Sequence, residues 1–190
     1  MKIYSVTPDT NYRLLFPEDG VYDSVFWEFN AQPLAGKLPL HFSAYFKENS
    51  DKPIPDVAWM GMLTFAFRAD VATALLDILE PHGELLPCKV EGEVWYVYNV
   101  LSVAKVDVTR SSYEVDDGVN RFGLIKPHFL LEDLREKSIF KIEEDNYSAT
   151  YSVDDRSTDD SILSSLFCAI SAHGYTGLKF NTVFDDGAFS

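Results

Sequence analysis

The stretch GELLPCKVEGEVWYVYNVLSVAKVD, which spans residues 83–107, says most about the fold. Residues 84–90 and 93–99 are two apolar runs, and Glu91-Gly92 between them can form a tight turn because glycine accepts a positive φ. The pattern predicts a β-hairpin. Every position from 94 to 98 is apolar or aromatic, so both faces of the second strand are apolar. This strand is therefore expected inside a sheet, with a layer on each side.

The chain before the hairpin has the pattern of short strands separated by turns rich in proline and glycine. Strands are expected at residues 2–6, 12–16, 40–46 and 62–67, with loops at 17–20, 33–36 and 49–55. Apolar residues at helical spacing then predict a helix over residues 71–79, with Asp70 as its N-cap. Pro81 and Gly83 mark the end of that helix.

The chain after the hairpin predicts a mixture of strand and helix. We expect a polar loop at 110–120, a strand at 121–126, a short helical segment at 129–135, a strand at 139–142 and an acidic, mostly solvated segment at 143–160. A C-terminal amphipathic helix over 158–173 is the most clearly marked element, with Ile162, Leu163 and Leu166 in its apolar stripe and Gly174 at its end. A closing strand at 178–184 is expected to rejoin a sheet.

These elements predict an α+β protein, built chiefly of antiparallel and mixed β-sheet with a few packing helices. With 190 residues and 46% hydrophobic content, the chain can bury a core of ordinary size. We expect one domain over residues 1–190. The alternative is a division into a β-rich N-terminal portion, 1–68, and an α+β C-terminal portion, 69–190.

Net charge narrows the classes of partner. The chain has 30 acidic and 16 basic residues, a formal net charge of -14. This charge disfavours contact with nucleic acid or with an anionic membrane and favours a basic protein partner. The first residues lack the apolar core of a secretion signal, and no apolar run is long enough to span a bilayer, so we expect a cytoplasmic protein. The sequence favours no particular oligomeric state.

Few residues suggest chemistry. His82, Cys88 and Asp107 could form a thiol nucleophile with its base and an orienting carboxylate. Cys88 and Cys168 both lie in apolar surroundings, however, which favours reduced thiols packed in the core. The four histidines lack the paired spacing that is typical of metal sites. We therefore expect no catalytic residue, no cofactor and no metal.

Acidic pairs and tryptophans are the candidates for binding a partner. Neighbouring acids in polar segments usually form a solvated surface that can face a basic partner. The candidate acids are Asp116, Asp117, Glu143, Glu144, Asp154 and Asp155. Trp27 and Trp59 lie near loop-rich segments, where an aromatic ring can anchor an interface. The alternative is an enzyme that uses carboxylates as general acid and base on a small-molecule or glycan substrate.

A family resemblance is carried by segments spread over most of the chain. They are MKIY at 1–4, GELLP at 83–87, YNV at 98–100, Asp107, FKI at 140–142 and GYTGLKF at 174–180. Together they resemble the immunity proteins of bacterial polymorphic toxin systems, a family with a myxobacterial-type immunity domain that was formerly a domain of unknown function. The chain departs from the family at 106–108, where VDV replaces an Asp-Ala-Leu-Asp-like run.

The resemblance implies a cytoplasmic antidote that binds a cognate toxin and blocks it without chemistry of its own. It implies no catalytic residues, because the family's motifs look structural. An acidic, aromatic-containing surface is then expected to meet a basic surface of the toxin, as complementary charge speeds association.

Overall fold

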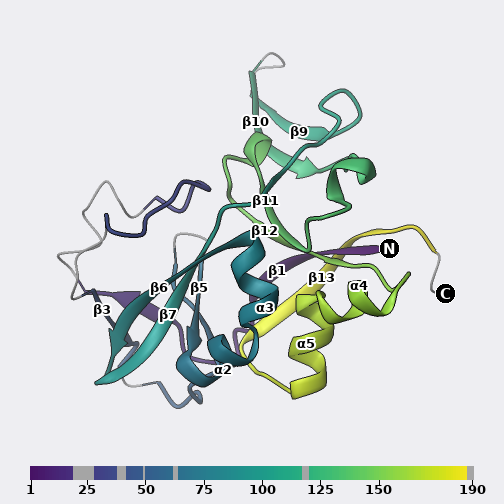
Figure 1. The fold of residues 1–190 in the computed structure, drawn as a ribbon. Helices are drawn as coiled ribbons and strands as arrows, with labels where there is room; N and C mark the ends of the chain where they lie inside the picture. Colours follow the sequence, from purple (N-terminus) through teal and green to yellow (C-terminus); the bar gives the residue numbers. More distant parts are fainter. Residues whose placement is uncertain (19–27, 38–41, 49, 62–63, 117–119, 188–190) are drawn as a thin grey trace.

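The computed structural model describes residues 1–18, 28–37, 42–48, 50–61, 64–116 and 120–187. Over these residues the protein is α+β, as predicted. Two mixed sheets and a separate two-stranded ribbon combine with short helices (Figure 1).

The larger sheet has six strands in the order β2-β3-β6-β7-β5-β4. Their bounds are β2 (Leu15–Pro17), β3 (Ser43–Phe46), β4 (Val57–Trp59), β5 (Phe65–Arg68), β6 (Gly83–Val90) and β7 (Glu93–Val100). The predicted hairpin is confirmed: β6 and β7 pair antiparallel across a turn where Glu91 and Gly92 have φ of 50° and 93°. β7 lies between β6 and β5, inside the sheet, as its two apolar faces predicted. β4 was not predicted, and residues 40–41 and 62–63 of two predicted strands lie outside the described residues.

The second sheet has five strands in the order β13-β1-β12-β11-β8. Their bounds are β1 (Lys2–Pro8), β8 (Val103–Ala104), β11 (Ile139–Ile142), β12 (Thr150–Asp154) and β13 (Leu178–Asp185). β1 pairs antiparallel with both β12 and β13, so the predicted closing strand is confirmed. The sheets do not follow the alternative division at residue 68, because β6 and β7 join strands that precede it and β1 joins strands that follow it.

A two-stranded ribbon projects from the rest of the molecule (Figure 1). It consists of β9 (Ser112–Asp116) and β10 (Asn120–Lys126), which pair antiparallel. The prediction of a strand at 121–126 is confirmed, but the prediction of a polar loop at 110–120 is wrong over β9. Polar residues are compatible with a strand here because a ribbon beside the body has no fully buried face to fill.

The helices are shorter than predicted. The helix predicted at 71–79 is two helices, α2 (Ala69–Ala74) and α3 (Leu76–Leu79), which are separated at Leu75 and followed by the 3-10 turn η1 (Glu80–His82). Asp70 is not the N-cap. It lies in the first turn, where its carboxylate accepts hydrogen bonds from the guanidinium of Arg68. Over the described residues, no helix combines the length and the apolar character that crossing a membrane requires.

The predicted C-terminal helix is also divided, into α4 (Asp159–Leu163) and α5 (Leu166–His173). Thr158 caps α4 in a reciprocal pair with Ser161, and the Ser165 hydroxyl accepts a hydrogen bond from the N–H of Cys168 to cap α5. A serine side chain in this position competes for backbone N–H groups and so favours a new helix start over continuation. Gly174, with φ of 68°, ends α5 as predicted. Two further 3-10 turns are η2 (Leu131–Leu134) and η3 (Glu143–Asp145).

The central core joins the two sheets through the helices. It contains Val71, Leu75 and Leu79 from the α2–α3 region and Leu166 and Ile170 from α5. Strand residues complete this cluster: Val6, Val57, Phe65, Phe67, Tyr98, Val100 and Ile139. Two other clusters lie around Trp95 on the six-stranded sheet and around Phe140 on the five-stranded sheet. The helices therefore pack against strands of both sheets through apolar burial, which contributes about 1.5–3 kcal/mol for each large side chain.

A polar network lies on the opposite side of the hairpin from Tyr98. Glu84 and Asn99 face each other across β6 and β7. The Nδ2 atom of Asn99 donates to Oε1 of Glu84 and to the carbonyl of Gln32, both at 2.8 Å. The Glu84 carboxylate also accepts from the N–H groups of Leu34 and Ala35, at 2.5 and 3.2 Å. Segment 32–35 is therefore held to the hairpin by the Glu84 carboxylate and the Asn99 amide.

Lys141 attaches the same region to the other sheet. Its side chain on β11 is fully buried, and its Nζ donates to the carbonyl of Phe29 at 2.6 Å. Burial lowers the pKa of Lys141 to about 8, while the nearby carboxylate of Asp145 opposes that effect. The segment around residues 29–35 thus receives hydrogen bonds from both sheets.

The turn before β13 attaches that strand to β4. The Asp56 carboxylate accepts from the N–H and the hydroxyl of Thr176, at 2.9 and 2.8 Å, and the N–H of Val57 donates to the Thr176 carbonyl at 3.0 Å. Arg68 holds Asp56 in place with an ion pair of 2.9 Å. An edge strand of one sheet is thereby joined to an edge strand of the other.

Gly177 should be intolerant of any side chain. Its φ is +106°, and an added Cβ would lie 2.6 Å from Cβ of Pro55 and would press on the carbonyl oxygen of Val57. We expect Gly177→Ala to lower the free energy of unfolding by about 3–5 kcal/mol. Gly174→Ala is the control, because its φ is also positive but no atom lies within 4 Å. It should cost about 1 kcal/mol. Urea unfolding of both variants checks this, and equal losses would contradict it.

Glu84 should matter more than its half-buried position suggests. Glu84→Ala leaves three donors without their acceptor, so we expect a loss of about 2–4 kcal/mol in the free energy of unfolding. The matched control is Glu93→Ala on the neighbouring strand, where the carboxylate is exposed. It should change stability by less than about 0.5 kcal/mol. Similar unfolding midpoints for the two variants would show that the network does not stabilise the fold.

Candidate partner-binding groove

An apolar groove lies between α3 and the pair α4–α5. It encloses a hollow of about 430 Å³. Most of its lining is apolar: Ala74, Leu75, Ile78, Ile162, Leu163, Ala169 and Ala172. Leu163 is 74% exposed, the largest exposed fraction among the large apolar side chains that the structure describes. Ile162 and Leu163 are both exposed and continue the apolar lining, and a contiguous exposed apolar surface is typical of one that another molecule covers.

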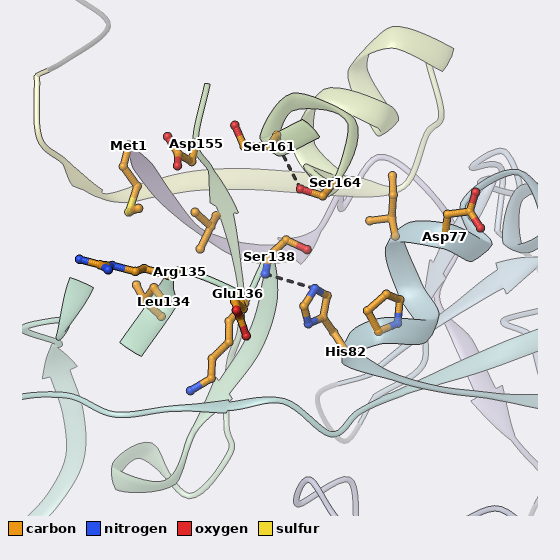
Figure 2. A pocket seen from close by; sticks show the side chains of 14 residues that line it. Met1, Asp77, His82, Leu134, Arg135, Glu136, Ser138, Asp155, Ser161 and Ser164 are labelled. Carbon is orange, nitrogen blue, oxygen red and sulfur yellow. Dashed lines mark hydrogen bonds between the residues drawn. The ribbon is translucent and has the colours of Figure 1, made fainter. Parts of the chain in front are cut away.

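A second, more polar hollow adjoins the first. It has a volume of about 240 Å³, and Asp77 and Ile78 line both hollows. Figure 2 shows His82 and Ser138 on one side of it and Ser161 and Ser164 on the other. We call the two hollows together the groove.

His82 is a neutral hydrogen-bond acceptor in this second hollow. Its Nε2 accepts a hydrogen bond from the N–H of Ser138 at 3.3 Å (Figure 2). Burial lowers the pKa of His82, which favours the uncharged ring with its proton on Nδ1. His82 therefore adds no positive charge to the groove near neutral pH.

Three carboxylates line the groove: Asp77 from α3, Glu136 from the chain before β11, and Asp155 from the chain just after β12. Asp159 and Asp160 lie in the first turn of α4, next in sequence to the lining residues Ser161 and Ile162. Asp155 accepts hydrogen bonds from the N–H and the hydroxyl of Ser157. Within the described residues, none of these five carboxylates forms an ion pair. Their charges are therefore left for a partner to neutralise.

Basic groups lie on one side only. Arg135 and Lys137 line the smaller hollow from the chain between η2 and β11. Lys137 is already paired with Asp133 at 2.8 Å, whereas the apolar hollow has no lysine or arginine in its lining. The apolar part of the groove is thus bordered by negative charge.

The structure places the predicted binding residues at different ends of the molecule. Asp155 lines the groove, whereas Glu143 and Glu144 form η3, which contacts β10 of the projecting ribbon. Asp116 ends β9. Its side chain, Asp117 and Trp27 lie outside what the structure describes. The predicted residues therefore do not form one surface.

The expectation for Asp154 was wrong. It was expected on a solvated segment, but it is 1% exposed and ends the buried strand β12. Its carboxylate pairs with Arg156 at 3.0 Å and accepts a hydrogen bond from the thiol of Cys168 at 3.4 Å. α5 packs against β12, which explains why a polar strand is buried there. Only part of segment 143–160 is solvated.

Trp59 contributes to the core. It is half-buried on β4, and its ring meets that of Phe65 edge to face with the centroids 5.0 Å apart. It packs against the central cluster.

The groove itself was missed because its residues were assigned to a core-facing stripe. Ile162 and Leu163 follow the helical spacing of Leu166 and Ile170, so one continuous helix would bury all four. The break at residues 164–165 turns α4 away, and only Leu166 and Ile170 are buried. Two adjacent serines at that point are the signal that could have indicated it.

The proposed thiol site is not formed. Cys88 is buried in the cluster around Trp95, while His82 lines the groove. Burial raises the pKa of Cys88 to about 12, and the Asp107 carboxylate binds Thr109 and the N–H of Arg110. Among the residues whose positions are described, no three His, Cys, Asp or Glu side chains are grouped to hold a metal ion.

Comparison with protein-family models gives no match to this chain, and no curated protein sequence matches it. The resemblance to immunity proteins stays a prediction that rests on the segments quoted above.

The two cysteines should differ in reactivity. We expect iodoacetamide at about pH 8 to modify Cys168 slowly in the folded protein and Cys88 only after unfolding, because a buried thiol with a raised pKa has almost no thiolate. Cys168 lines the groove and is half-exposed, although burial raises its pKa as well. Peptide mass spectrometry with and without urea measures both sites. Modification of Cys88 in the folded protein as fast as or faster than modification of Cys168 would contradict this.

Proposed function

We propose that this protein is a non-catalytic immunity protein of the bacterial cytoplasm. It binds a cognate toxin domain through the groove and blocks it by covering a basic surface of that toxin. The observation that carries the proposal is the combination of an exposed apolar hollow with bordering carboxylates that have no ion-pair partner among the described residues.

The apolar part of the groove can supply binding energy. Leu163 and Ile162 together expose much of their surface, and each large apolar side chain that becomes fully buried contributes about 1.5–3 kcal/mol. Interfaces commonly have an apolar centre surrounded by a polar rim. The groove has this arrangement, with Asp77 at the apolar hollow and Glu136 and Asp155 in the adjoining hollow.

The acidic part of the groove can speed association with a basic partner and make the binding selective. A net charge of -14 attracts a basic partner over distance, and unpaired carboxylates at the contact fix its orientation. A toxin that acts on an anionic substrate needs a basic cleft, which an acidic inhibitor can occlude. The interaction should therefore weaken as ionic strength rises.

The carboxylates that suggested an enzyme do not support acid–base catalysis in pairs. Asp154 is buried in an ion pair with Arg156, while its neighbour Asp155 points into the groove region. Glu143 and Glu144 lie elsewhere, on η3. The pair Asp154-Asp155 is thus divided between different environments, and the pair Glu143-Glu144 is removed from the groove.

The decisive experiment combines capture with a growth assay. A tagged protein is used to capture its partner from a lysate of the source cells, and the captured module is then expressed alone and together with this protein. We expect the module to stop growth alone and growth to return on co-expression. A captured module without toxicity, or toxicity that co-expression leaves unchanged, would contradict the proposal.

The groove's charge is tested with a matched pair of variants. Asp159→Asn with Asp160→Asn should weaken binding to the captured toxin about tenfold at low salt, and the loss should shrink at high salt. Glu91→Gln with Glu93→Gln removes the same charge at the exposed hairpin turn and should change affinity less than about twofold. Calorimetric titration measures both, and equal effects would place the interface elsewhere.

A further inference from the structure

The walls of the groove indicate which kind of element can enter it. Every residue that lines the apolar hollow belongs to α2, α3, α4, α5 or Leu75 between α2 and α3. Figure 1 shows α3 and α5 near each other on the same side of the sheets. The binding surface is therefore helical on both sides.

Helical walls offer no sheet edge to an extended strand. A strand is added to a sheet by pairing with the row of N–H and C=O groups along an edge strand, and no strand lines the apolar hollow. A strand that entered would bury its own backbone groups without partners, which costs about 1–3 kcal/mol for each group. A guest helix bonds its own backbone internally and avoids this cost.

The length of the groove suits a short helix. α5 has eight residues, so it is about 12 Å long at 1.5 Å per residue. Its groove-facing residues Cys168, Ala169, Ala172 and His173 recur at helical spacing along one face. Anchors at positions i, i+4 and i+7 of a guest helix would span about 10 Å, which fits beside α5.

Carboxylates along the groove specify the flanks of that helix. Asp77 lines the apolar hollow from α3, and Glu136 and Asp155 line the adjoining hollow. None has an ion-pair partner in the described part of the chain. Positive side chains on either side of an apolar stripe would meet these charges.

We infer that the groove binds an amphipathic helix of the partner, with an apolar stripe of about three anchors flanked by lysine or arginine. This inference rests on the proposed function, because it takes the toxin as the source of the helix. It commits to a protein helix and excludes strand addition at the groove.

Model peptides test the inference without the toxin. The probe is a fluorescent peptide of about 14 residues, made of leucine and lysine in a helical period. Its isomer has the same composition in a strand period of two. We expect the helical peptide to bind at least about tenfold more tightly by fluorescence anisotropy. Equal binding of the isomers, or no binding of either, would overturn the inference.

Variants of the groove test whether the helical peptide binds there. Leu163→Asn removes an exposed anchor, and Ala172→Trp fills the hollow at an exposed position, so neither should prevent folding. Each substitution should lower the affinity for the helical peptide about tenfold. Ile125→Asn is the control, because Ile125 is 64% exposed on the projecting ribbon. Unchanged binding by both groove variants, or an equal loss in the control, would overturn the inference.

The two proposals can fail separately. A captured toxin that places a strand or a loop in the groove would overturn the helix and leave the immunity function standing. If the helical peptide binds as expected but the captured partner is not toxic, the immunity function is overturned and the helix-binding groove stands.

Discussion

Much of the structure depends on the burial of one tyrosine in the central strand of the larger sheet. The hydroxyl of Tyr98 donates to the carbonyl of Leu79 at 2.8 Å, which satisfies the end of α3 inside the protein. Burial raises the pKa of Tyr98, so the hydroxyl keeps the proton that it donates. The ring also requires Gly83 in β6, because an added Cβ there would lie 2.7 Å from its Cε2 atom. The next residue, Asn99, points the other way and binds Glu84. Two neighbouring residues of β7 thus position a helix on one face and a chain segment on the other.

Elements with strong local patterns could be predicted from the sequence, and their assembly could not. The hairpin at 83–100 was predicted because its turn and its apolar runs are adjacent in the chain. The burial of Asp154 depends on α5 packing across β12, and nothing within a few residues of Asp154 records that contact. The division of the last helix depends on Ser165 as a cap, because the helix propensity of serine alone does not prevent a continuous helix. The groove depends on how these distant segments pack, and of its lining carboxylates only Asp155 was predicted from the sequence.

The groove illustrates how a local break can create a binding surface. If α4 and α5 were one helix, Leu163 would share the face of Leu166 and be covered by the body. The break leaves α4 as a separate wall, which opens the hollow against α3, and the first turn of α4 carries two acids. These acids also favour the positive end of α4, so the same side chains support the local fold and the negative rim. The same acids therefore stabilise α4 and favour a basic partner.

The position of β1 has a consequence for how the chain acquires its structure during synthesis. β1 lies between β12 and β13, so residues 2–8 can take their place only after residues up to 185 have left the ribosome. The six-stranded sheet uses strands from residues 15–100 alone and can form earlier. Pairing between the first and last strands is the most distant contact in sequence, and such contacts are slow to form. For that interval β1 of the nascent protein lacks at least one of its two neighbouring strands, and Met1, which lines the smaller hollow beside β1, is not held by its final neighbours.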